Sequence, residues 1–164
     1  MKGIKRTIKR RRKEGKTDYK ARFALLKTGR PRIVVRKTNR YIIAQLVSSD
    51  QAQDKVIASA NSKELLAHGW PKERAGSLKN LQASYLTGVL LSNKIKNEEN
   101  AKEIIFDIGL HRNVKKSRIY AFLKGLIDSG IKIAHSPDIL PDEKKLEENT
   151  KTREIFIKLK GKLK

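Results

Sequence analysis

Positive charge is concentrated near the two ends of this 164-residue chain, and that separation constrains the fold more than any other feature. Residues 1–50 hold 17 Lys and Arg against 3 acids, and residues 151–164 hold 6 against 1. Residues 51–100 and 101–150 carry net charges of only +2 and +1. A compact state with a net charge of +22 repels itself, so such a charge usually reflects a polyanionic partner. The pattern predicts a nearly neutral folded body with basic ends, bound to nucleic acid.

Composition also excludes several classes of protein. Hydrophobic residues make up 38% of the chain, enough to bury a core, so a wholly disordered basic protein is not expected. There is no cysteine, which removes disulfides and thiolate zinc sites and suits a reducing compartment. No apolar run reaches the roughly 20 residues that span a bilayer, so we expect a soluble intracellular protein without a membrane partner. We divide the chain into a flexible basic arm (1–16), a globular domain (17–146) and a basic C-terminal extension (147–164).

Local patterns in the first half predict a helix followed by three strands. Thr17 or Asp18 can cap a helix that runs to about Thr28, with one side formed by Tyr19, Phe23 and Leu26. Residues 32–37 and 41–48 are rich in β-branched residues and form a predicted hairpin, in which Asn39 takes a positive φ. A third strand is predicted at 56–60.

The second half predicts helices around one more strand. Asn61 and Glu64 have the spacing of a capping box for a short helix that ends at His68-Gly69. Apolar residues at helical spacing predict a long helix over 77–97, in which Gly88 marks a close backbone contact. A strand is predicted at 103–108, a Ser117-capped helix ending at Gly130, and a short helix from 141. The order predicts an α/β fold with a single domain: a mixed β-sheet flanked by helices.

Catalytic and metal-binding patterns are missing. His68 is expected to stabilise a helix C-terminus, and His135 to make a local hydrogen bond. His111 could touch phosphate, stack on a base or simply be a solvated loop residue. The three histidines lack ligand spacing, and Asp107 is the only acid in a predicted strand, whereas metal-dependent nucleases need several converging carboxylates. We therefore expect no catalytic residue, no metal and no cofactor.

The predicted hairpin instead carries groups suited to nucleic acid. Arg32 and Arg36 share strand parity and should project from one face, with Ile33 and Val35 on the other. Their guanidinium forks can pair with phosphates. Asn39 could hydrogen-bond to base edges or backbone oxygens of the nucleic acid, or could serve only to form the turn. Tyr41 could stack on an exposed base or could only pack on the sheet. Trp70 is expected to be a packing anchor under a loop. With only 5% aromatic residues, recognition of a folded RNA's backbone is favoured over reading of a single strand, although DNA is not excluded.

Five ordered blocks of sequence resemble one protein family. The blocks are Arg10–Val47 (beginning RRRKEGKTDYKARFALLKTGRPRIVVRKTNRY), Ala58–Leu65, Ala83–Gly88, Asp107–Leu110 and Arg118–Gly130. Together they resemble the large-subunit ribosomal protein family numbered eighteen in bacteria, in its archaeal and eukaryotic form. The resemblance implies a ribonuclease-H-like fold without catalytic carboxylates. It also implies a non-enzymatic protein in the cytoplasmic ribosome that binds 5S rRNA and attaches it to large-subunit rRNA at the central protuberance, beside neighbouring ribosomal proteins.

Matching positions imply which residues contact RNA. These are Arg10, Arg11, Arg12, Tyr19, Arg22, Arg30, Arg32, Arg36, Asn39 and Arg40. From their charge or position we add Lys9, Lys13, Lys16, Lys37, Tyr41, His111, Arg112, Lys115, Lys116 and Arg118. Asn113, Lys116 and Ala134 depart from the family's usual residues. The tail inherits no function, although its charge suggests another rRNA contact. A metal-dependent nuclease and an architectural DNA-binding protein are the competing hypotheses.

Overall fold

Four strands form one mixed sheet in the order β3-β2-β1-β4, in a computed structural model that describes residues 7–51, 53–96 and 103–163. β1 (Arg32–Lys37) pairs antiparallel with β2 (Ile42–Asp50), and β2 pairs antiparallel with β3 (Gln53–Asn61). β4 (Ile105–Asp107) pairs parallel with β1 at the other edge. The predicted mixed sheet is thereby confirmed, with β3 longer than expected.

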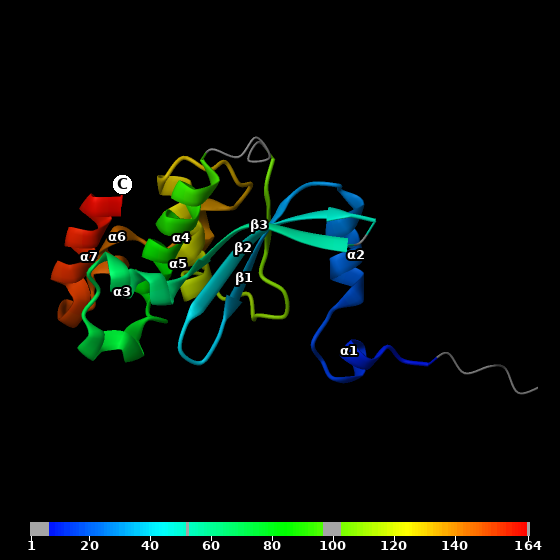
Figure 1. Ribbon diagram of the computed structural model, residues 1–164, viewed down its shortest axis with the longest axis horizontal. Helices are drawn as coiled ribbons and strands as arrows, with labels where there is room; N and C mark the ends of the chain where they lie inside the picture. Colours follow the sequence, from blue (N-terminus) through cyan, green and yellow to red (C-terminus); the bar gives the residue numbers. More distant parts are fainter. Residues whose placement is uncertain (1–6, 52, 97–102, 164) are drawn as a thin grey trace, which may run out of the picture.

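Helices α3 to α7 gather at one end of the molecule (Figure 1). Their bounds are Leu65–His68 for α3, Leu81–Ile95 for α4, Arg118–Asp128 for α5, Glu143–Glu147 for α6 and Thr150–Leu163 for α7. Short 3-10 turns occupy Ser62–Glu64, Lys72–Ser77 and Pro137–Ile139. The core lies between these helices and the sheet face that carries Ile33 and Val35, both fully buried. Trp70 is buried in the same core, as expected of a packing anchor.

Two glycines let α4 and α5 approach backbone to backbone. A Cβ atom on Gly88 would clash with the carbonyl oxygen of Phe122, and one on Gly125 would clash with that of Tyr85. Because each glycine faces the other helix's main chain, any side chain there would force the helices apart. The predicted close contact at Gly88 is confirmed, and Gly125 is its reciprocal partner.

The N-terminal elements lie at the opposite end of the molecule from α7 (Figure 1). α1 (Arg10–Lys13) is a single turn, and α2 (Tyr19–Lys27) contains no buried residue. Asp18 caps α2 by accepting hydrogen bonds from the backbone N–H groups of Lys20 and Ala21. The first six residues of the predicted arm lie outside the described residues.

Three local predictions differ from the structure. Asn39 does not take a positive φ; Thr38 closes the turn by accepting the Tyr41 N–H with its hydroxyl and donating that hydroxyl to the Tyr41 carbonyl. Ser117 is the N-cap of α5, but its hydroxyl makes no capping hydrogen bond. The long helix begins at Leu81 rather than Ser77, because Asn80 caps it through the Ala83 N–H; its predicted end, Asn97, lies outside the described residues.

The segment predicted as a basic extension forms α7, which packs on α4. Phe156 and Leu159 are buried, and Phe156 meets the ring of Tyr85 edge-on, with centroids 5.5 Å apart. Thr152 donates its hydroxyl to the Gln82 side chain, and the Asn93 side chain donates to the Leu163 carbonyl. Described residues of 147–164 therefore contribute to the same core; where domain and extension divide stays a prediction.

Candidate nucleic-acid interface

A cleft of about 260 Å³ lies on the face of the sheet opposite the core. Its walls come from the basic arm, α2, β1 and the loop after β4, and they include the side chains of Arg11, Lys16, Arg22, Arg32, Arg36, Asp107 and His111. The alternation of β1 turns Arg32 and Arg36 toward this cleft while Ile33 and Val35 enter the core. The sequence prediction that the two arginines share a face is thereby confirmed.

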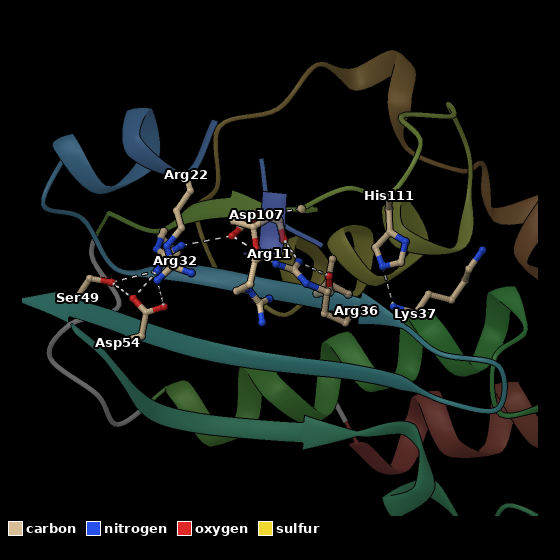
Figure 2. Close-up of polar contacts among 12 residues, drawn as sticks. Arg11, Arg22, Arg32, Arg36, Lys37, Ser49, Asp54, Asp107 and His111 are labelled. Carbon is tan, nitrogen blue, oxygen red and sulfur yellow. Dashed lines mark hydrogen bonds and ion pairs between the residues drawn. The ribbon is translucent and has the colours of Figure 1, made fainter. Parts of the chain in front are cut away.

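Arg32, however, is buried beneath the cleft rather than exposed in it. Its side chain is only 3% exposed, and its guanidinium contacts Asp54 at 2.8 Å and Asp107 at 3.3 Å (Figure 2). The Ser49 hydroxyl accepts a further bond from Arg32 Nη2 at 3.0 Å. Because Asp54, Asp107 and Ser49 hold both Nη atoms of this buried guanidinium, Arg32 organises the site, and its predicted contact with RNA stays a prediction.

Asp54 links this buried group to α2. Its second oxygen accepts from Arg22 Nη2 at 2.7 Å, across 32 residues of sequence. Burial raises the pKa of Asp54, but the hydrogen bond from Ser49 and the charges of Arg32 and Arg22 outweigh burial and hold that pKa below its ordinary value. The carboxylate is therefore charged at neutral pH and fixes α2 against the sheet.

Arg36 presents a half-exposed guanidinium at the rim of the cleft. Its Nη1 donates to the Val35 carbonyl at 2.8 Å and to the Asp107 carbonyl at 3.3 Å, while 45% of the side chain stays exposed. Gly109, at φ +59°, passes directly under this group: a Cβ there would lie 2.7 Å from Arg36 Cζ. Asp107 holds the glycine by accepting its N–H at 2.7 Å. The Asp107–Leu110 segment thus supports the Arg36 guanidinium from below and fixes its orientation.

His111 joins the cleft to a second hollow. Its Nε2 accepts the backbone N–H of Lys37 at 3.0 Å (Figure 2). Burial, with the charges of Arg36 and Lys37, lowers the pKa of His111, which keeps the acceptor nitrogen unprotonated at neutral pH. His111 is therefore not a freely solvated loop residue, and its predicted contact with RNA stays a prediction. The second hollow is lined by Lys37, Arg112 and Arg118, over apolar Leu81, Val114 and Ile119.

The remaining predicted contacts come from the arm, the hairpin turn and the segments before β1 and α5. In the arm, Lys9, Arg10, Arg11, Arg12, Lys13 and Lys16 are all exposed. Lys9 also lies over the ring of Tyr19, 4.6 Å from its centroid. At the hairpin turn Asn39 and Arg40 are exposed and Tyr41 is half-buried. Four of these predicted cations are in ion pairs: Arg10 and Lys16 with Glu14 at 3.7 and 2.9 Å, Arg30 with Glu103 at 3.0 Å, and Lys116 with Asp142 at 2.6 Å. Lys115 is exposed.

We call this continuous surface the basic face: residues 9–16, α2, the exposed side of β1 with its turn, and residues 109–118. Sequence reasoning did not identify the two residues that shape it most, Asp54 and Gly109. Asp54 has no local signal, because it meets Arg32 and Arg22 only through strand pairing. Gly109 lies within a motif matched to the family, and a glycine directly after a strand is the signal that could have identified it.

We also searched the described residues for a metal-binding cluster and for a membrane-spanning helix. In that part of the chain no three His, Cys, Asp or Glu side chains form a group suited to a metal ion. Nor is any helix there long and apolar enough to cross a bilayer. His135 makes the local hydrogen bond expected of it, with Nδ1 2.7 Å from the Ile133 carbonyl oxygen.

Comparison with known proteins gives a consistent result. The sequence matches the family described as ribosomal large subunit proteins 60S L5 and 50S L18 over residues 5–104 and 92–136. It is 53% identical over 137 residues to large ribosomal subunit protein uL18 of Korarchaeum cryptofilum, covering 84% of this chain and 68% of that protein. It is 46% identical over 137 residues to the uL18 of Methanococcus maripaludis, with the same coverage, and 44% identical over 138 residues to that of Aeropyrum pernix, covering 62% of the relative.

The family match includes β1, Asp54, Asp107 and the loop beneath Arg36, so the basic face lies inside the shared region. The matches also explain why the sequence shows no catalytic motif, because the family consists of structural ribosomal proteins and not of enzymes. Ribosomal RNA and ribosomal proteins are accordingly its partners. The chain belongs to the uL18 family of large-subunit ribosomal proteins.

Proposed function

We propose that this protein binds 5S rRNA through the basic face and attaches it to large-subunit rRNA at the central protuberance, in cytoplasmic ribosomes. The single observation that carries the proposal is Arg36: a half-exposed guanidinium held in a fixed orientation by two backbone carbonyls and Asp107. A pre-oriented fork loses less entropy on pairing with a phosphate than a freely rotating side chain does.

The surroundings of Arg36 favour RNA over a small anion. Its cleft continues through His111 into the hollow lined by Lys37, Arg112 and Arg118, and through Arg11 and Lys16 into the exposed arm. A surface of this extent can follow several successive phosphates of a folded RNA. Most of its cations project from strands, helices and tight loops, which suits recognition of a fixed shape.

Direct binding tests the proposal. The full chain is titrated with 5S rRNA and, separately, with an unrelated structured RNA of equal length at the same salt concentration. We expect clearly tighter binding to 5S rRNA, and we expect that complex to retain a large-subunit rRNA fragment that the protein-free 5S rRNA does not. Equal affinity for the two RNAs would contradict the proposal, since it would show only attraction between opposite charges.

Arg36→Lys tests the residue that carries the proposal. Lysine keeps the charge but loses the fork, so affinity for 5S rRNA should fall about tenfold or more, the worth of one charge-assisted contact of about 1.5–3 kcal/mol. Arg153→Lys is the matched control, because Arg153 is similarly exposed but lies on α7. Equal affinities for the wild-type chain and Arg36→Lys would remove Arg36 from the interface.

A further inference from the structure

Phe23 is the most exposed large hydrophobic side chain among the described residues, at 69%. The sequence pattern placed it on one side of a helix with Tyr19 and Leu26, and none of the residues of α2 is buried. A lone exposed hydrophobic residue needs no explanation. What distinguishes Phe23 is its position on a helix that itself belongs to the basic face.

The geometry of α2 directs Phe23 away from the protein. Ala21, Arg22 and Leu25 line the cleft, so they define the inward side of the helix. At 100° per residue the opposite side carries Lys20, Phe23 and Lys27. Lys20 and Lys27 are separated by about 10 Å along the helix axis, with the ring between them. The outward stripe of α2 is therefore one aromatic ring with an ammonium group on either side.

α2 holds this stripe in a fixed position. The Asp18 cap fixes the start of the helix, and the ion pair from Arg22 to Asp54, at 2.7 Å, ties its inner side to the sheet. Asp54 is bonded in turn to buried Arg32. The ring is thus presented by a secondary-structure element whose backbone position is set before any partner binds.

The charges on the stripe favour RNA as its partner. Residues 19–27 contain no acid, so a purely apolar protein groove that covered Phe23 would have to desolvate Lys20 and Lys27 without compensation. A nucleotide meets both requirements, because an unstacked base offers a π face and its flanking phosphates offer negative charge.

We propose that Phe23 stacks on an unpaired base of the bound RNA, while Lys20 and Lys27 contact the phosphates on either side of it. This inference rests on the proposed function, since the RNA is 5S rRNA. It extends the interface to the outer side of α2, beyond the cleft, and adds a stacking contact to the charged groups of the basic face.

The test is a set of four variants of the full chain, titrated with 5S rRNA at several salt concentrations. Phe23→Ala and Phe23→Leu should each weaken binding by about 5- to 100-fold, with the salt slope unchanged, because stacking releases no counterions. Phe23→Trp should retain affinity. The paired change Lys20→Gln and Lys27→Gln should flatten the slope of log K against log[salt] by about 1.5 units.

Phe23→Trp also reports directly on stacking. The chain's single native tryptophan, Trp70, is buried in the core, so the wild-type titration provides the blank. We expect the fluorescence of the introduced indole to be quenched when 5S rRNA binds. Melting curves of all variants should match that of the wild type, because the substituted side chains are exposed.

Each remaining outcome contradicts the inference. Unchanged affinity of Phe23→Ala would show that the ring faces solvent or a protein in the assembled particle. Full retention by Phe23→Leu would show an apolar contact without stacking. If the wild-type chain itself failed to prefer 5S rRNA, the proposed function would fail and this inference with it, an outcome distinct from a defect confined to the Phe23 variants.

Discussion

Arg32 and Arg36 lie four residues apart on one face of β1, and their surroundings give them different roles. Arg32 is enclosed by Asp54, Asp107 and Ser49, whereas Arg36 keeps nearly half of its side chain exposed. Strand parity predicts the shared face correctly. It cannot predict what covers that face, because Asp54 reaches Arg32 only through the pairing of β2 with β3.

Arg32→Ala should therefore destabilise the fold, in addition to any effect on RNA. The substitution leaves Asp54 and Asp107 without their shared buried counterion, which should cost about 3–5 kcal/mol of unfolding free energy, measured by urea denaturation. Arg36→Ala is the control: its ion pair is half-exposed, so its loss should cost about 1 kcal/mol or less. Equal, small effects of the two substitutions would show that the Arg32 cluster does not support the fold.

At the scale of elements, local chemistry predicted most of the boundaries. The capping box of Asn61 and Glu64 and the glycine contact at Gly88 are present as expected. The role of α7 in the core was not predicted, because the net positive charge of the tail suggested only another rRNA contact. Phe156, Leu159 and Leu163 have helical spacing, and in the structure all three lie against the core. The many lysines of this segment drew attention away from the helical spacing of its apolar residues. Those residues need a surface to pack against, and α4 provides that surface.

Phe156→Ala tests whether α7 stabilises the fold. Phe156 is buried against Tyr85, so the substitution should lower the unfolding free energy by about 3–5 kcal/mol in urea denaturation. Ile157→Ala, next to it on the same helix, should change stability by no more than about 0.5 kcal/mol, because Ile157 is 50% exposed. If the two variants proved equally stable, α7 would be a peripheral tail and not part of the core.

Across the whole molecule, the arm and α2 of the basic face lie at the opposite end from α7 (Figure 1). The basic face holds the arm and α2, and α7 carries exposed Lys151 and Lys158 at the other end (Figure 1). Much of the first fifty residues' charge falls on the basic face, with a cleft and pre-oriented groups beside it. We therefore propose that 5S rRNA binds the basic face and that α7 is left for other contacts.

The most direct test removes equal charge from each end and measures 5S rRNA affinity as a function of salt. One variant combines Arg11→Gln with Lys16→Gln, both in the cleft, and the other combines Lys151→Gln with Lys158→Gln on α7. We predict that the cleft variant binds more weakly and that its slope of log K against log[salt] flattens by about 1.5 units, whereas the α7 variant matches the wild type. Equal losses in the two variants would contradict the account, because they would show that net charge, and not the basic face, binds the RNA.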